Sequence, residues 1–130
     1  MYKPALTAAI LFALIGVIVG AMGAHALRPI LTPDLRDSYE TAVKYQFYHS
    51  FALAIVGILH LAFPSAWIRR ATLAFIAGII LFSGSIYLLV YLKTTASLGL
   101  AGLGILTPIG GLFFILGWLC LLVGINVKKK

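Results

Sequence analysis

The sequence predicts an all-α integral membrane protein, a four-helix transmembrane bundle with its N- and C-termini in the cytoplasm. Apolar residues make up 62% of the 130 residues and charged residues only 10%, whereas a typical soluble domain has about 25% charged residues. The charges lie mostly between four uncharged apolar runs. Each run reaches the about 20 residues with which a helix crosses a hydrocarbon core, and the polar stretches between them are too short to form a second domain.

The first apolar run predicts a transmembrane helix over about residues 4–25. Small residues recur in it at spacings of three and four, so they form one stripe that includes Gly16, Gly20 and Gly23. Helices in lipid associate by close van der Waals contact, which small side chains permit. We therefore expect this helix to pack tightly through the stripe.

The same run has features of a secretory signal peptide, because a basic residue precedes it and Ala24-His25-Ala26 has the form of a cleavage site. Its apolar part is longer than the about 7 to 15 residues of such a signal. Three further apolar runs follow it. We expect the first helix to remain uncleaved.

A polar segment precedes the second apolar run. Thr32-Pro33-Asp34 supplies a cap residue, a proline for the first helical position and an acid for the first turn. Glu40 and Lys44 follow at the i,i+4 spacing of a helical ion pair. The sequence predicts an interfacial helical segment over about residues 33–44 and a transmembrane helix over about residues 45–64.

Two further runs predict transmembrane helices over about residues 69–92 and 104–126. In the last of them Gly110 and Gly117 lie at heptad spacing, a period that suits shallow left-handed helix crossings. The glycine-rich stretch 99–104 and the proline that follows it favour a broken or re-entrant start of this helix, a device found where membrane-protein backbone lines a cavity.

The basic residues predict the orientation of the helices. At one end of the bundle lie six basic residues with no acid beside them: Lys3, Arg69, Arg70 and the three C-terminal lysines. At the other end lie Arg28, Arg36, Lys44 and Lys93, together with all three acids. The positive-inside rule therefore places both termini in the cytoplasm. We expect the tail, Lys128 to Lys130, to lie against anionic lipid headgroups. The basic residues form no patch with interleaved aromatics, so we expect no nucleic-acid partner.

Polar side chains inside or beside the apolar runs are the candidates for function. Consecutive helices are antiparallel, so the end of the first, the start of the second, the end of the third and the start of the fourth lie at one membrane face. Ionisable groups at that depth suggest a functional site. We expect an outward-facing polar pocket there, which binds a small polar or anionic ligand or a lipid headgroup. Its expected lining is His25, Arg28, Tyr45, Gln46, His49, Ser83, Tyr87 and Thr107.

Each of these side chains also has a structural interpretation. Tyr45 could anchor its helix in the aromatic belt at the membrane surface. Gln46 and Ser83 could serve only as hydrogen-bond contacts between helices. His49 could be a buried histidine whose two nitrogens are satisfied within the protein. The sequence leaves both interpretations open.

Four stretches together resemble a known family: residues 20–27, 45–49, 82–87, and 107–111 followed by Gly117-Trp118. They resemble the small four-helix membrane proteins classified as domain of unknown function 423, which are related to the mitochondrial transmembrane protein 256 group. The resemblance covers almost the whole chain. It implies a four-helix protein of the bacterial inner membrane and implies no activity.

Two function hypotheses remain, and neither is an enzyme. The three histidines lack metal-ligand spacing, and Cys120 has no basic neighbour in sequence, so we expect no cofactor, metal site or nucleophilic catalysis. The first hypothesis is a binding or transport protein that uses the polar pocket. The second is an accessory or assembly subunit of a larger membrane complex. The small size favours the second, since transport would require a homo-oligomer.

Overall fold

The computed structural model describes residues 1–95 and 102–127, and all regular secondary structure in these residues is helical. In chain order the elements are α1 (Lys3–Ala24), α2 (Pro33–Leu59), α3 (Ala66–Ile79), the π-helical turn η1 (Ile80–Gly84), α4 (Ser85–Thr94), the 3-10 helix η2 (Leu103–Ile105) and α5 (Leu106–Asn126). Because α3, η1 and α4 are continuous, they form one of four helical stretches that are long and apolar enough to cross a membrane. The predicted all-α four-helix fold is confirmed.

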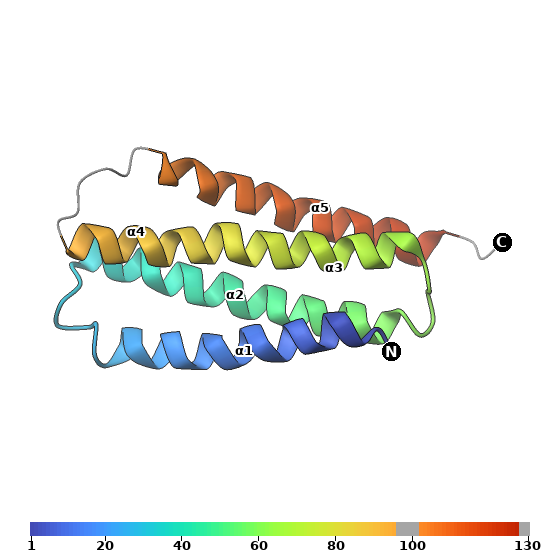
Figure 1. The fold of residues 1–130 in the computed structure, drawn as a ribbon, viewed down its shortest axis with the longest axis horizontal. Helices are drawn as coiled ribbons and strands as arrows, with labels where there is room; N and C mark the ends of the chain where they lie inside the picture. The colour runs from blue at the N-terminus through green and yellow to red at the C-terminus, as the bar shows by residue number, and fades with distance from the viewer. Residues whose placement is uncertain (96–101, 128–130) are drawn as a thin grey trace.

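The helices run antiparallel and lie side by side in the order α1, α2, α3 to α4, and α5 (Figure 1). α1 packs almost entirely on α2, whereas α5 packs on α3 and η1. The connection between α1 and α2, the end of α4 and the start of α5 lie together at what we term the loop end. The N-terminus and the connection between α2 and α3 lie at the opposite, terminal end (Figure 1).

α2 is one unbroken helix from Pro33 to Leu59, which includes the predicted interfacial segment over residues 33–44 and most of the predicted transmembrane helix over residues 45–64. Thr32 caps its start by accepting a hydrogen bond from the Leu35 N–H at 3.4 Å. It ends earlier than predicted because Pro64 lacks a backbone N–H and disfavours helical backbone in the residue before it.

α3 begins at Ala66, a few residues before the predicted start at about residue 69. Ser65 sets this start, since its hydroxyl oxygen accepts a hydrogen bond from the Ile68 N–H at 3.3 Å. At the same end of the bundle, the N–H of Tyr2 donates to the carbonyl oxygen of Gly57 at 3.0 Å. This bond joins the chain just before α1 to the last turn of α2.

The glycines of α1 lie against aromatic side chains of α2. A Cβ atom at Gly16 would overlap the ring of Phe47, and one at Gly23 would overlap the ring of Tyr39. Gly20 is less constrained, because a Cβ there would lie 3.4 Å from the Val43 side chain, an ordinary contact. α1 is therefore tightly docked, but it lies at the edge of the bundle (Figure 1).

α5 and α3 pack by a reciprocal exchange of rings and glycines. The Phe75 ring of α3 covers Gly117 of α5, and the Phe114 ring of α5 covers Gly78 of α3. Each glycine provides the space that the opposite ring fills. This exchange brings the two helices together without a hydrophobic driving force, which lipid does not supply.

The π-helical turn η1, which the sequence pattern did not predict, lies where α5 comes closest to the backbone of its neighbour. A Cβ atom at Gly110 would overlap backbone atoms of Leu81 and Phe82. π-helical turns commonly interrupt α-helices at functional sites. Here Ser83, which lies within the turn, donates its hydroxyl hydrogen to a backbone carbonyl oxygen of α2, that of Ala42, at 2.8 Å.

The start of α5 is more regular than predicted within the described residues. Gly102 and Gly104 lie at and within a short 3-10 helix that continues directly into α5. Gly99 and the basic tail, Lys128 to Lys130, lie outside the described residues. The expected re-entrant start therefore has no counterpart from residue 102 onward.

We expect Gly110→Ala to lower the stability of the bundle by about 1 to 3 kcal/mol, because backbone atoms cannot move aside for the added methyl group. Gly84→Ala is the matched control, since no atom lies within 4 Å of a Cβ atom at that position. Thermal unfolding in detergent measures both variants. Equal melting temperatures for Gly110→Ala and the parent protein would contradict the close contact between α5 and η1.

Candidate functional site: grooves beside α2

The first half of α2 carries charged and hydroxyl side chains beside apolar parts of its neighbours. Val43 of α2 lies against Gly20 of α1, and Tyr39 of α2 lies against Gly23. Both glycines belong to the last turns of the apolar helix α1, which ends at Ala24. From Lys44 to Leu59, α2 rises only about 23 Å, which is less than the about 30 Å of a hydrocarbon core. The polar part of α2 therefore reaches into, or close to, the level of the apolar layer.

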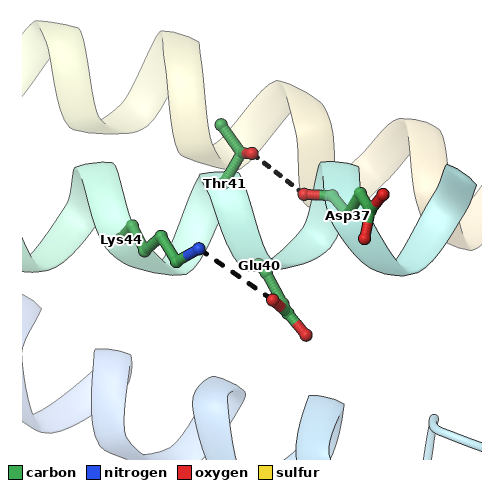
Figure 2. Close-up of polar contacts among 4 residues, drawn as sticks. All are labelled: Asp37, Glu40, Thr41 and Lys44. Carbon is green, nitrogen blue, oxygen red and sulfur yellow. Dashed lines mark hydrogen bonds and ion pairs between the residues drawn. The ribbon is translucent and has the colours of Figure 1, made fainter. Parts of the chain in front are cut away.

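These polar side chains divide between two faces of α2 (Figure 2). Glu40 and Lys44 lie on the side nearer α1, where Lys44 Nζ is 4.0 Å from Glu40 Oε2. Thr41 lies on the side nearer α4, and its hydroxyl donates to the carbonyl oxygen of Asp37 at 2.9 Å. The ion pair is more than half exposed and contributes little to stability.

A groove of about 470 Å³, which we term the polar groove, lies between α2, α4 and the start of α5. Asp37, Ser38 and Thr41 line it from α2. Lys93 lines it from α4, and Thr107 lines it from the first turn of α5. Most of its remaining lining is apolar, so these five side chains provide its polar chemistry.

A second groove of about 620 Å³ lies between α2 and α5, and we term it the aromatic groove. Tyr45 and His49 line it from α2, and Phe114 and Trp118 line it from α5. Phe82 lines both grooves. The two grooves therefore share the Phe82 side chain as a common wall, one being polar near the loop end and the other aromatic toward the middle of the bundle.

His49 is held by three contacts in the aromatic groove. Its Nδ1 lies 2.8 Å from the carbonyl oxygen of Tyr45, which can only accept, so Nδ1 carries the hydrogen. Its Nε2 then accepts a hydrogen bond from Trp118 Nε1 at 3.4 Å. The ring also stacks on Phe114 with centroids 3.4 Å apart. This arrangement is that of a neutral histidine with both nitrogens satisfied inside the protein.

A buried hydrogen-bond network connects three helices beside the grooves. Gln46 Nε2 donates to the carbonyl oxygen of Phe12 in α1 at 2.7 Å, and Gln46 Oε1 accepts from the Tyr87 hydroxyl of α4 at 2.9 Å. Ser83 donates to the carbonyl oxygen of Ala42 at 2.8 Å. Gln46 is 2% exposed and Ser83 is fully buried. These side chains hold helices together, and a ligand in either groove does not reach them.

The structure does not gather the eight expected residues into one pocket. His25 and Arg28 lie exposed on the turn after α1. Tyr45 stacks on Phe82 with ring centroids 4.7 Å apart and lines the aromatic groove with His49. The remaining residues divide between the buried network and the polar groove, because the helices are rotated about their axes so that each presents a different face to its neighbours.

Sequence reasoning missed four of the residues in the polar groove: Asp37, Ser38, Thr41 and Lys93. It interpreted the charges of this segment only as a helix start and an i,i+4 ion pair. The signal that could have found the three on α2 is their spacing, since Thr41 lies four residues after Asp37 and three after Ser38, and residues at these spacings are neighbours on a helix surface. That face continues into Tyr45, which places it in line with the aromatic groove.

The sequence model of a family described as "Protein of unknown function (DUF423)" matches residues 19–111. This range includes all of α2 to α4 and both walls of the polar groove. No solved structure matches the chain.

Several bacterial membrane proteins are similar over most of the chain. A UPF0382 membrane protein of Staphylococcus aureus (strain bovine RF122 / ET3-1) is 39% identical over 111 residues, which are 85% of this chain and 85% of the relative. The UPF0382 membrane protein YwdK of Bacillus subtilis is 36% identical over 114 residues, with 85% and 86% covered. A UPF0382 membrane protein of Haemophilus influenzae is 32% identical over 114 residues, with 88% and 86% covered.

We expect Tyr87→Phe to destabilise the bundle by about 1 to 2 kcal/mol, because it leaves the buried Oε1 of Gln46 without its donor. Tyr91→Phe on the same helix is the control, since the Tyr91 side chain is 64% exposed. Thermal unfolding of both variants in the same detergent is the measurement. A larger loss for Tyr91→Phe than for Tyr87→Phe would show that the network does not stabilise the fold.

Proposed function

The chain belongs to the DUF423 family, whose relatives are named membrane proteins, and from this premise we propose that it binds one membrane lipid per protomer. The headgroup occupies the polar groove, and an acyl chain occupies the aromatic groove. The supporting observation is that the two grooves adjoin at Phe82. A polar groove and an apolar groove that share one wall match an amphiphile better than they match a wholly polar ligand.

The level of the polar groove supports a lipid as the ligand. The charged part of α2 lies at the end of the apolar layer, where lipid headgroups meet hydrocarbon. A headgroup beside Asp37 and Thr41 would place its acyl chains toward Tyr45 and Trp118. Aromatic rings at this depth offer broad apolar contact with modest loss of conformational entropy.

We place the polar groove in the outer leaflet of the bacterial inner membrane. Six basic residues belong to the terminal end, counting the three lysines that follow α5, whereas four belong to the loop end: Arg28, Arg36, Lys44 and Lys93. The positive-inside rule favours the terminal end in the cytoplasm. This orientation makes the bound lipid accessible from the outside.

The proposed role is binding, without catalysis. The nitrogens of His49, the strongest candidate for a general base among the groove residues, are both engaged by other groups of the protein. Within the described residues the four helical stretches lie in a row, with α1 and α5 at opposite edges, an arrangement that does not close into a ring around a path. Transport of the bound lipid would therefore require several copies of the chain.

A role as an accessory or assembly subunit is the second candidate. The observation that favours it is the edge position of α1, which packs almost entirely on α2. Its opposite face exposes a stripe that includes Ile10, Leu14 and Ile18, and a helix of another protein could pack there. Extraction in mild detergent should then recover a stoichiometric protein partner, and purification of the chain without one would count against this role.

We expect Gly111→Phe to abolish lipid binding, because its ring would fill the aromatic groove. The backbone tolerates the change, since the nearest atom to a Cβ atom there is 3.9 Å away, on the Phe82 ring. Leu116→Phe on the exposed surface of α5 is the control. Native mass spectrometry should show one lipid adduct on the parent and on Leu116→Phe, and none on Gly111→Phe. An adduct retained equally by all three proteins would contradict the proposed site.

The orientation has its own test, in a Cys120→Ala background. A membrane-impermeant maleimide should label Arg28→Cys and Lys93→Cys from outside intact spheroplasts. It should label Arg69→Cys only after lysis. Labelling of Arg28→Cys and Lys93→Cys from opposite sides of the membrane would contradict the four-span topology.

A further inference from the structure

The polar groove presents two opposite charges on different helices. Asp37 lies on α2 and Lys93 lies on α4. Both side chains are exposed, and within the described residues neither forms an ion pair, the pair of Glu40 and Lys44 being on the other face of α2. The groove therefore holds a separated carboxylate and ammonium group, with space between α2 and α4 for a ligand that contacts both.

The hydroxyl groups of the α2 wall act as hydrogen-bond acceptors toward the groove. A hydroxyl has one hydrogen and two lone pairs. Ser38 donates its hydrogen to the carbonyl oxygen of Asp34 at 2.9 Å, and Thr41 donates to that of Asp37 at 2.9 Å (Figure 2). Their remaining lone pairs, together with the Asp37 carboxylate, make this wall a set of acceptors.

The hydroxyl on α5 has the same character. Ser85 donates its single hydrogen to the carbonyl oxygen of Phe82 at 3.0 Å, because a carbonyl can only accept. Thr107 must then be the donor in its 2.7 Å contact with Ser85, which leaves the Thr107 oxygen as an acceptor. Of the five polar side chains in the groove, only Lys93 therefore offers hydrogens to a ligand.

We propose that the polar groove selects a phospholipid whose headgroup carries a protonated primary amine beside its phosphate. The amine donates hydrogen bonds to the wall formed by Asp37, Ser38 and Thr41. The phosphate accepts from the Lys93 ammonium, a charge-assisted contact. This assignment rests on the proposed function, since it names the class of lipid that the same groove binds.

Other common headgroups match this arrangement less well. A trimethylated amine has a positive charge but no N–H groups, so it leaves the hydroxyl acceptors of α2 unpaired. A glycerol headgroup has hydroxyl donors but no positive charge to meet the Asp37 carboxylate. Specificity of this kind arises from the groups that a wrong ligand leaves without partners.

The experiment is a competition for the protein in detergent micelles, measured by native mass spectrometry. Three phospholipids with identical acyl chains are compared, whose headgroups are aminoethyl phosphate, its trimethylated form and glycerol phosphate. We expect the aminoethyl lipid to bind about fivefold more than either competitor, a ratio of the size that one lost hydrogen bond supports for the trimethylated lipid and one lost exposed charge pair supports for the glycerol lipid. Asp37→Asn should abolish the preference over the glycerol lipid, because it removes the carboxylate that the ammonium group meets, and Lys93→Gln should lower binding of all three lipids.

Matched controls come from the opposite face of α2. Glu40→Gln and Lys44→Gln make the same charge changes outside the polar groove, and both should keep the preference of the parent. Melting temperatures of all four variants should stay near that of the parent, because the substituted side chains are exposed.

Two results would overturn the inference, and they differ in what they say about lipid binding. The first is equal binding of the three lipids by the parent and by Asp37→Asn, which would contradict selection of the headgroup. If Gly111→Phe still abolished binding, the proposed lipid site itself would stand. Absence of any retained lipid on the parent protein would remove the proposed function itself, and headgroup selection with it.

Discussion

Polar groups within the apolar layer need partners inside the protein, because hydrocarbon offers no hydrogen bonds. The structure satisfies this constraint through α2. Gln46 donates to the backbone of α1, and Ser83 of η1 donates to the backbone of α2. Each bond joins two helices that lipid alone would not drive together. α2 is thus the element to which α1 and α4 are held, and the positions of both depend on a few buried polar contacts.

α5 is held by a different means, and this difference accounts for the grooves. Its glycines receive side chains and backbone of α3 and η1, so the helix is drawn toward that stretch. It makes few contacts with α2. The space between α2 and α5 is consequently filled by rings such as Tyr45 and Phe114, with room left beside them. An open lateral groove follows from the placement of small residues on one face of α5.

The site could be anticipated from the sequence only in part. Antiparallel connectivity correctly brings Gln46 and Tyr87 to similar depth, and they bond to each other. Their similar depth in the membrane did not reveal that they bond to each other across helices instead of lining a pocket. For Gln46, the interpretation as a hydrogen-bond contact between helices is the one that the structure supports. Asp37 and Lys93 line a groove instead, although their sequence context is that of ordinary interfacial charges. The difference lies in the rotation of each helix about its axis, which no local pattern reports.

By itself the sequence determined that the chain forms four membrane-crossing helical stretches. It also determined their approximate residue ranges and which helix ends share a membrane face. These properties follow from the length of apolar runs and the position of charges, which are local. Only the tertiary structure decided the π-helical turn η1, the edge position of α1 and the grooves beside α2. Each of these depends on contacts between segments far apart in the chain, such as Gly110 against Phe82, and such contacts are selected by the fit of surfaces.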